Sequence, residues 1–160
     1  QDFLSASAAQ SVASAVLQKA LALLARCEQC RFGLEKKLLA KGFSKSVVKG
    51  VLDALEEKNL LSDERFARAW LNSRRITRFE GRTRLLAELA SRGISKEVSK
   101  KAVDDFFEEF SEEEICALSA QKLLKRGLEE KKLIASMQRA GFDYKMAREA
   151  VFNAKKSLQE

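Results

Sequence analysis

The chain has 160 residues, of which 46% are hydrophobic and 33% charged, and its formal net charge is +7. The absence of proline, the small number of glycines and the runs rich in Ala, Leu, Lys and Glu favour an all-α fold over a β-sheet fold. No apolar stretch is long enough to cross a bilayer and the N-terminus has no signal-peptide pattern, so we expect a cytoplasmic protein without a membrane span.

The residue types argue against an enzyme. The sequence has no histidine, the usual general acid–base residue and metal ligand. It has no glycine-rich phosphate loop. Cys27 and Cys30 have the spacing of half a zinc site or of a redox motif, but Cys116 is the only other cysteine and the βαβ context of a redox motif is absent. We therefore expect a binding protein with no catalytic residues, no metal and no cofactor.

Three glycines, Gly42, Gly93 and Gly141, mark an internal repeat. An apolar residue stands eight positions before each glycine and another stands four positions before it. The glycine is followed by an apolar residue and then by Ser or Asp. The three sets are Leu34, Leu38, Phe43 and Ser44; Leu85, Leu89, Ile94 and Ser95; and Leu133, Met137, Phe142 and Asp143. Glycine accepts the positive φ that ends many helices, and Ser or Asp caps the next helix by accepting a backbone N–H bond. The repeat predicts three helix–turn–helix pairs.

One further helix is predicted before each pair. Residues 10–26 carry an amphipathic apolar stripe, and residues 63–75 and 112–126 begin with acids, which suits the helix dipole. The glycines are 51 and 48 residues apart, which leaves room for this extra helix. We therefore predict three tandem three-helix repeats, at 1–60, 61–108 and 109–160.

The positive charge of the chain is concentrated in its middle. From Arg65 to Lys101 there are 11 Lys and Arg against 3 acids, a net charge of +8, so the rest of the chain sums to −1. A basic helical segment in an otherwise balanced chain is typical of a partner that is a polyanion, most often nucleic acid. The candidate binding residues are Arg65, Arg68, Arg74, Arg75, Arg78, Arg82, Arg84, Arg92, Lys96 and Lys100.

The predicted helix 63–75 separates its arginines from its apolar face. Arg65, Arg68, Asn72 and Arg75 fall within about 80° of one another, opposite much of the face that carries Phe66 and Trp70. We expect Arg68, Arg75 and Arg82 to contact phosphates and to lie off the packing faces. The alternative is a solvated face whose arginines pair with neighbouring Glu, which the small number of nearby acids disfavours.

An acidic stretch follows at 104–114, with 7 acids and no base. It is interpreted as solvated helix ends. The alternative is an acidic face that keeps the third repeat off phosphates or meets a basic protein surface.

The motifs of the middle resemble the RecX family of recombinase regulators. The resemblance rests on LLSDERFARAWLNSRR and EGRTRLLAELASRGIS, which carry Leu61, Asp63, Arg65, Phe66, Ala67, Glu88, Leu89, Arg92, Gly93 and Ile94. The first repeat is similar to the family's turn at Leu34, Lys37, Leu38, Lys41, Gly42 and Phe43. Two departures are the link from Arg78 to Arg82, which lacks one Gly and the Pro that are common in the family, and Cys30, where a Ser usually stands.

The resemblance implies a cytoplasmic regulator of RecA, acting in DNA repair, recombination and the SOS response. It implies three helical repeats in an elongated, curved body that binds RecA and the RecA–DNA filament and inhibits strand exchange, ATP hydrolysis and coprotease activity. We expect a monomer that also binds single- and double-stranded DNA without sequence preference. The alternatives are a helix-turn-helix protein acting directly on duplex promoter DNA and a helical scaffold, which the basic middle disfavours.

Overall fold

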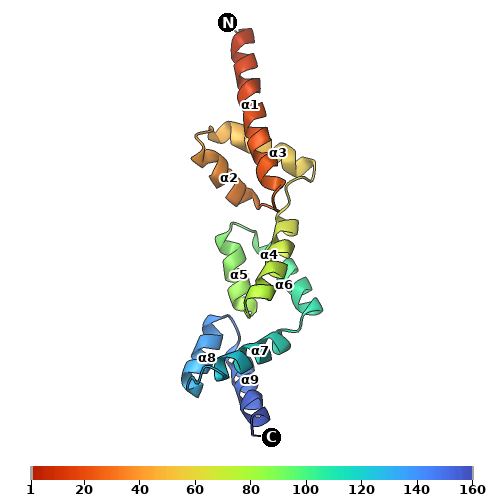
Figure 1. Ribbon diagram of the computed structural model, residues 1–160. Helices are drawn as coiled ribbons and strands as arrows, with labels where there is room; N and C mark the ends of the chain where they lie inside the picture. Colours follow the sequence, from red (N-terminus) through yellow and green to blue (C-terminus); the bar gives the residue numbers. More distant parts are fainter. Residues whose placement is uncertain (1, 160) are drawn as a thin grey trace. The chain divides into compact units, whose positions relative to one another are not determined.

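A computed structural model describes residues 2–159, with side chains from Ser5 onward. The described chain is all-helical, as predicted, with nine α-helices and no strand (Figure 1). The helices are α1 (Asp2–Leu24), α2 (Arg31–Ala40), α3 (Lys45–Glu57), α4 (Asp63–Thr77), α5 (Arg82–Ser91), α6 (Lys96–Glu109), α7 (Glu112–Leu124), α8 (Glu130–Arg139) and α9 (Tyr144–Ser157). No helix within the described residues is long and apolar enough to cross a membrane.

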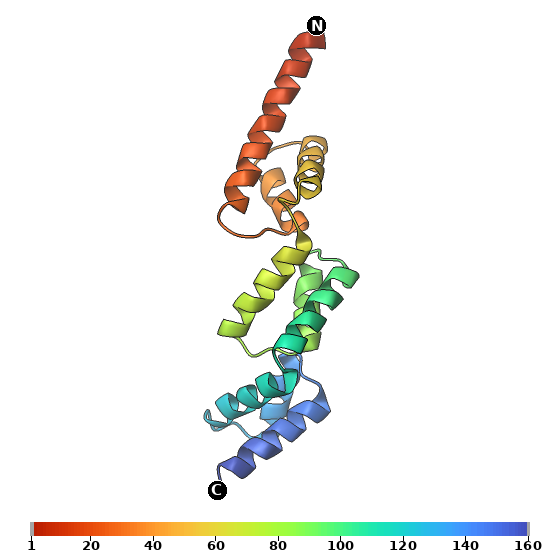
Figure 2. The ribbon, with the colours of Figure 1, turned by 90° about the vertical axis from the view of Figure 1, so that its right-hand side faces the viewer.

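The first of two compact units contains the chain to Ala67 together with Arg92–Ile94. Its helices α1, α2 and α3 pack against one another, as Figures 1 and 2 show. Each contributes residues at helical spacing to one core, in which Val16, Leu34 and Leu52 have no exposed surface. The remaining members of this core are Ala20, Leu38, Val48, Val51, Leu55 and Leu61.

The second unit contains Arg68–Ser91 and the chain from Ser95. Within it α7 packs on α8 and α9, α8 packs on α9, and α5 packs on α6. Leu133 and Met137 of α8 are fully buried, as is Cys116 of α7. Burial raises the pKa of the Cys116 thiol to about 12, so this cysteine is a small apolar core residue and not a reactive thiolate.

The repeat glycines end their helices as predicted. Gly42, Gly93 and Gly141 have φ of 90°, 73° and 97°. Ile94 and Phe142, which follow two of them, are 5% and 3% exposed and so pack back on the structure. The sequence analysis did not single out two further positions of this kind, where Asn59 has φ 57° after α3 and Gly127 has φ 72° after α7.

The predicted caps are confirmed at two of the three turns. The Ser95 side chain accepts a hydrogen bond from Val98 N, and that of Asp143 accepts from Lys145 N and Met146 N. The prediction for Ser44 is wrong, because its side chain makes no capping bond to α3 although its backbone has the extended N-cap conformation. Ser44 Oγ lies 3.5 Å from Ser46 Oγ instead.

Candidate nucleic-acid interface

The Glu80 carboxylate forms ion pairs with several of the candidate arginines. This carboxylate follows α4 in the chain and is 8% exposed. Arg74 donates from Nε to Oε2 over 2.9 Å and from Nη2 to Oε1 over 3.0 Å, which is a bidentate pair. Arg84 Nε and Arg78 Nη1 each lie 3.9 Å from Oε1. The Arg74 guanidinium also lies 5.0 Å from the centre of the Trp70 ring, so Arg74 belongs to the packing of this unit.

Arg82 is held by the acidic stretch 104–114. Its backbone N–H donates to Glu112 Oε1 over 2.8 Å, and its guanidinium is paired with Asp104 and lies 3.9 Å from Glu112 Oε2. Lys100 Nζ donates to the other oxygen of Asp104 over 2.6 Å. The pKa of Asp104 lies below its usual value because of the bonds from Lys100 and then from Arg82. Part of the acidic stretch therefore neutralises the basic middle.

Two candidate arginines lie in the first unit. Arg65 Nε donates to Glu28 Oε1 over 3.0 Å and its Nη1 donates to Asn59 Oδ1 over 2.8 Å. These bonds join the start of α4 to the segments that follow α1 and α3. The Arg92 side chain is half-buried, and its backbone carbonyl accepts a hydrogen bond from the Cys30 thiol at 3.5 Å.

Five candidate cations stay exposed in the second unit, and one of them, Lys100, is paired with Asp104; the other four are Arg68, Arg75, Arg78 and Lys96. Arg68 and Lys96 have no hydrogen bond or ion pair with any described residue. Arg75 keeps its charge accessible while its guanidinium lies 4.0 Å from the centre of the Phe110 ring. Arg68, Asn72 and Arg75 are spaced by four and three residues, which places them in one row on α4. With Arg78, just beyond Thr77, they form what we call the α4 basic face.

The structure therefore divides the candidates other than Arg92 into two groups. The alternative of arginines neutralised by acids describes Arg65, Arg74, Arg82, Arg84 and Lys100, whereas the α4 basic face and Lys96 retain charge that a partner can use. Arg82 was grouped with Arg68 and Arg75 as a phosphate contact, and the structure separates it from them. Its removal would also release Asp104 and Glu112 from their ion pairs.

The described residues contain no group of three or more His, Cys, Asp or Glu side chains placed to hold a metal ion. Cys27 is an exposed free thiol, while Cys30 and Cys116 are buried. Gln29 donates to Cys27 Sγ over 3.2 Å.

Sequence comparison places these helices in a known family. A model described as the second three-helix domain of RecX matches residues 62–103, which run from just before α4 into α6. The regulatory protein RecX of Treponema pallidum strain Nichols is 40% identical over 129 residues, covering 81% of this chain and 79% of that protein. The chain belongs to the RecX family. The RecX regulatory protein of Chlorobaculum tepidum is 32% identical over 143 residues and covers 86% of this chain and 87% of its own length.

Solved RecX structures have the same fold. The crystal structure of RecX from Lactobacillus salivarius superposes with a TM-score of 0.79 at 18% identity, covering 91% of this chain and 98% of that one. A second crystal structure, described as regulatory protein RecX, gives a TM-score of 0.80 at 20% identity and covers 94% and 76% of the two chains. At these identities the likeness establishes the all-helical fold, and the family assignment rests on the sequence relatives.

Proposed function

We propose that this chain regulates RecA by binding RecA and the RecA–DNA filament, and that it inhibits strand exchange, ATP hydrolysis and coprotease activity. The proposal joins membership of the RecX family to one observation, the exposed charge of the α4 basic face. The shortest ion-pair distance from the three guanidinium groups of this face to a described carboxylate is the 3.9 Å between Arg78 and Glu80. A guanidinium offers planar paired donors that match phosphate oxygens, and such contacts bind without reading the base sequence.

Several further features belong to the proposal. The chain acts as a monomer, without a cofactor and without chemistry of its own. It binds single- and double-stranded DNA without sequence preference. Its repeats are divided at 1–60, 61–108 and 109–160.

A helix-turn-helix protein acting directly on a promoter would need a helix whose exposed side chains read base edges. In the middle pair this helix would be α6. Lys100 donates to Asp104 over 2.6 Å and Lys101 donates to Asp105 over 2.8 Å, so two of its three lysines are neutralised on their own helix. The helix also carries Glu97, Glu108 and Glu109. Such an acidic surface disfavours entry into a groove lined by phosphates.

DNA binding at several salt concentrations tests the role of the α4 basic face. Replacing Arg68, Arg75 and Arg78 together by Ala should flatten the dependence of log affinity on log salt by roughly two to three units, because each phosphate contact releases condensed counterions. The matched control replaces Lys41, Lys45 and Lys58, three exposed lysines of the first unit, and should leave the slope unchanged. If the two triple variants have equal salt slopes and intact helicity, the α4 basic face does not bind phosphates. A preference of roughly 4 kcal/mol for one duplex would instead support the promoter-binding alternative.

A further inference from the structure

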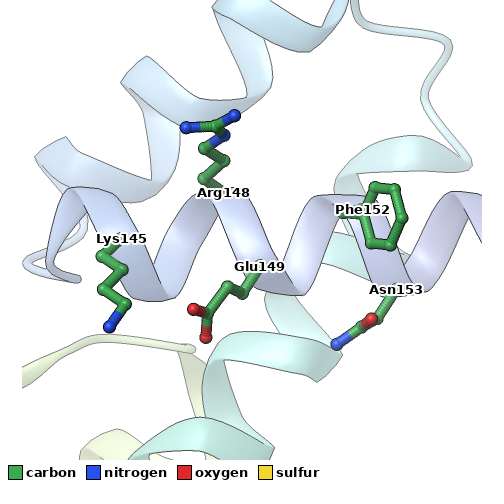
Figure 3. Close-up of a pocket in the computed structure, with 5 residues that line it drawn as sticks. All are labelled: Lys145, Arg148, Glu149, Phe152 and Asn153. Atoms are coloured by element: carbon green, nitrogen blue, oxygen red, sulfur yellow. The ribbon is translucent and has the colours of Figure 1, made fainter.

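The outer face of α9 carries an aromatic side chain beside an open surface hollow. Lys145, Glu149 and Asn153 form one row at spacings of four residues, and Arg148 and Phe152 form the neighbouring row. Figure 3 shows Lys145, Glu149 and Asn153 along one edge of the helix and Arg148 at the other edge. All five side chains line the hollow. All five residues come from α9.

Phe152 is not needed for the core of its unit. The inner face of α9 is complete without it, since Ala147, Ala150, Val151 and Ala154 are buried. The Phe152 side chain is 69% exposed, and Tyr144 on the same helix is 52% exposed. A single exposed apolar residue is ordinary, but two aromatic rings on one face among cations form an amphipathic surface of the kind that meets a ligand.

The charge around the hollow is positive. Lys145 and Lys156 are exposed and have no ion pair with the described residues. Lys155 is paired with Glu130, and Arg148 also lies close enough to Glu130 to help lower the pKa of that carboxyl group. Helix α9 itself carries four cations, Lys145, Arg148, Lys155 and Lys156, and one acid, Glu149.

Aromatic rings and cations on one face favour a particular class of polyanion. A base can stack on an exposed ring while its phosphate contacts a nearby Lys or Arg, and this mode needs unpaired bases. A duplex hides its base faces in the stack, and an acidic polypeptide offers no flat rings in regular succession. The Asn153 side chain, at the edge of the hollow, has an amide that can donate to and accept from a base edge.

We propose that the outer face of α9 binds single-stranded nucleic acid, with a base stacked on Phe152 and phosphates held by Lys145 and Arg148. This surface is separate in sequence from the α4 basic face. The inference rests on the single-stranded DNA binding of the proposed function and deepens it by assigning a second site, and its test omits RecA.

The test is the binding of a fluorescently labelled oligothymidylate to the full chain. Phe152→Ala should weaken binding by about fivefold or more, because a stacked base contributes that much on alanine substitution, and it should leave the salt slope unchanged because no charge is removed. The matched control is Leu158→Ala, since Leu158 is 72% exposed at the end of the same helix and should not affect binding. Phe152→Trp should retain binding, and its added emission should be quenched by the oligonucleotide.

A second variant tests the phosphate contacts. Replacing Lys145 and Arg148 together by Ala should flatten the salt slope by about 1.4 on a single strand. Wild-type affinity in Phe152→Ala, or no quenching in Phe152→Trp, would overturn the proposal. If Phe152→Ala weakens binding of polyglutamate but not of oligothymidylate, the face is a site for acidic protein and the proposal is likewise overturned. If only the α4 triple variant loses affinity for the oligonucleotide, this inference is wrong while the proposed function is still supported.

Discussion

Arg74 and Glu80 form a bidentate ion pair that closes the end of α4 onto the segment leading into α5. The Arg74 side chain is 18% exposed and that of Glu80 is 7% exposed, so both charges depend on each other for hydrogen bonds. The pair lets Arg74 pack inside this unit, and the same buried carboxylate lies 3.9 Å from the guanidinium groups of Arg78 and Arg84.

Breaking this pair should be costly. Arg74→Ala leaves the Glu80 carboxylate buried without its main partner, and we expect a loss of about 3 kcal/mol in the free energy of unfolding. The control is Arg78→Ala, whose side chain is 56% exposed and 3.9 Å from the same carboxylate, with an expected loss below about 0.5 kcal/mol. Urea unfolding followed by circular dichroism measures both. Equal stability of the two variants would show that the bidentate geometry contributes nothing.

Gly93 is expected to tolerate a side chain less well than Gly42. Both have positive φ, which costs an L residue about 1 to 2 kcal/mol. A Cβ at Gly93 would lie 2.6 Å from Phe32 Cβ, whereas one at Gly42 would meet nothing within 4 Å. Gly93→Ala should therefore lower the melting temperature more than Gly42→Ala, and Gly93→Val more again. If Gly93→Val has the same melting temperature as the wild type, the assignment of Gly93 as a helix-ending residue is wrong.

Acid should weaken the ties between α6 and Arg82. The pKa of Asp104 is lowered in the folded chain, first by Lys100 and then by Arg82. A lowered folded pKa means that its stabilising contribution is present above the unfolded value of about 3.9 and is lost as the pH falls through the folded pKa. When the pH is lowered below about 4, the urea concentration at the unfolding midpoint should decrease in the wild type. The decrease should be less steep in Asp104→Asn. Parallel pH profiles for the two proteins would count against the ion pairs.

Cys30 is expected to accept Ser without loss. It occupies the N-cap position of α2 in an extended conformation but makes no side-chain capping bond, and Ser is a far better capping residue. Cys30→Ser should leave stability unchanged or raise it by about 1 kcal/mol, and the double replacement with Cys27→Ser should retain binding. Thermal unfolding and zinc analysis of the purified protein check this. Stoichiometric zinc that disappears with activity in the double variant would contradict it.

The sequence was sufficient for the fold because its signals are local. A glycine eight residues after one leucine and four after another, as in Leu85, Leu89 and Gly93, specifies a helix and its end within a few turns. The Ser44 cap failed because the choice between bonding the backbone and approaching another hydroxyl depends on side-chain rotamers.

The candidate interface was harder to predict because two of its arginines pair with residues that are distant in sequence. Arg65 meets Glu28, which is 37 residues away, and Arg82 meets Asp104 and Glu112, which are 22 and 30 residues away. Counting acids near the arginines in sequence could not find these pairs. A complementary signal was present in the acidic stretch 104–114, which carries two of the partners of Arg82.

The central claim is that the chain regulates RecA on DNA through the α4 basic face, and RecA-catalysed ATP hydrolysis on single-stranded DNA tests it most directly. Titration with the wild-type chain should inhibit hydrolysis, as should the Lys41, Lys45 and Lys58 triple variant at the same concentration. The Arg68, Arg75 and Arg78 triple variant should require roughly tenfold more protein, because three exposed charge contacts at about 0.5 kcal/mol each sum to about one decade in affinity. Hydrolysis unaffected by the wild-type chain, or inhibited equally by both triple variants, would contradict the claim.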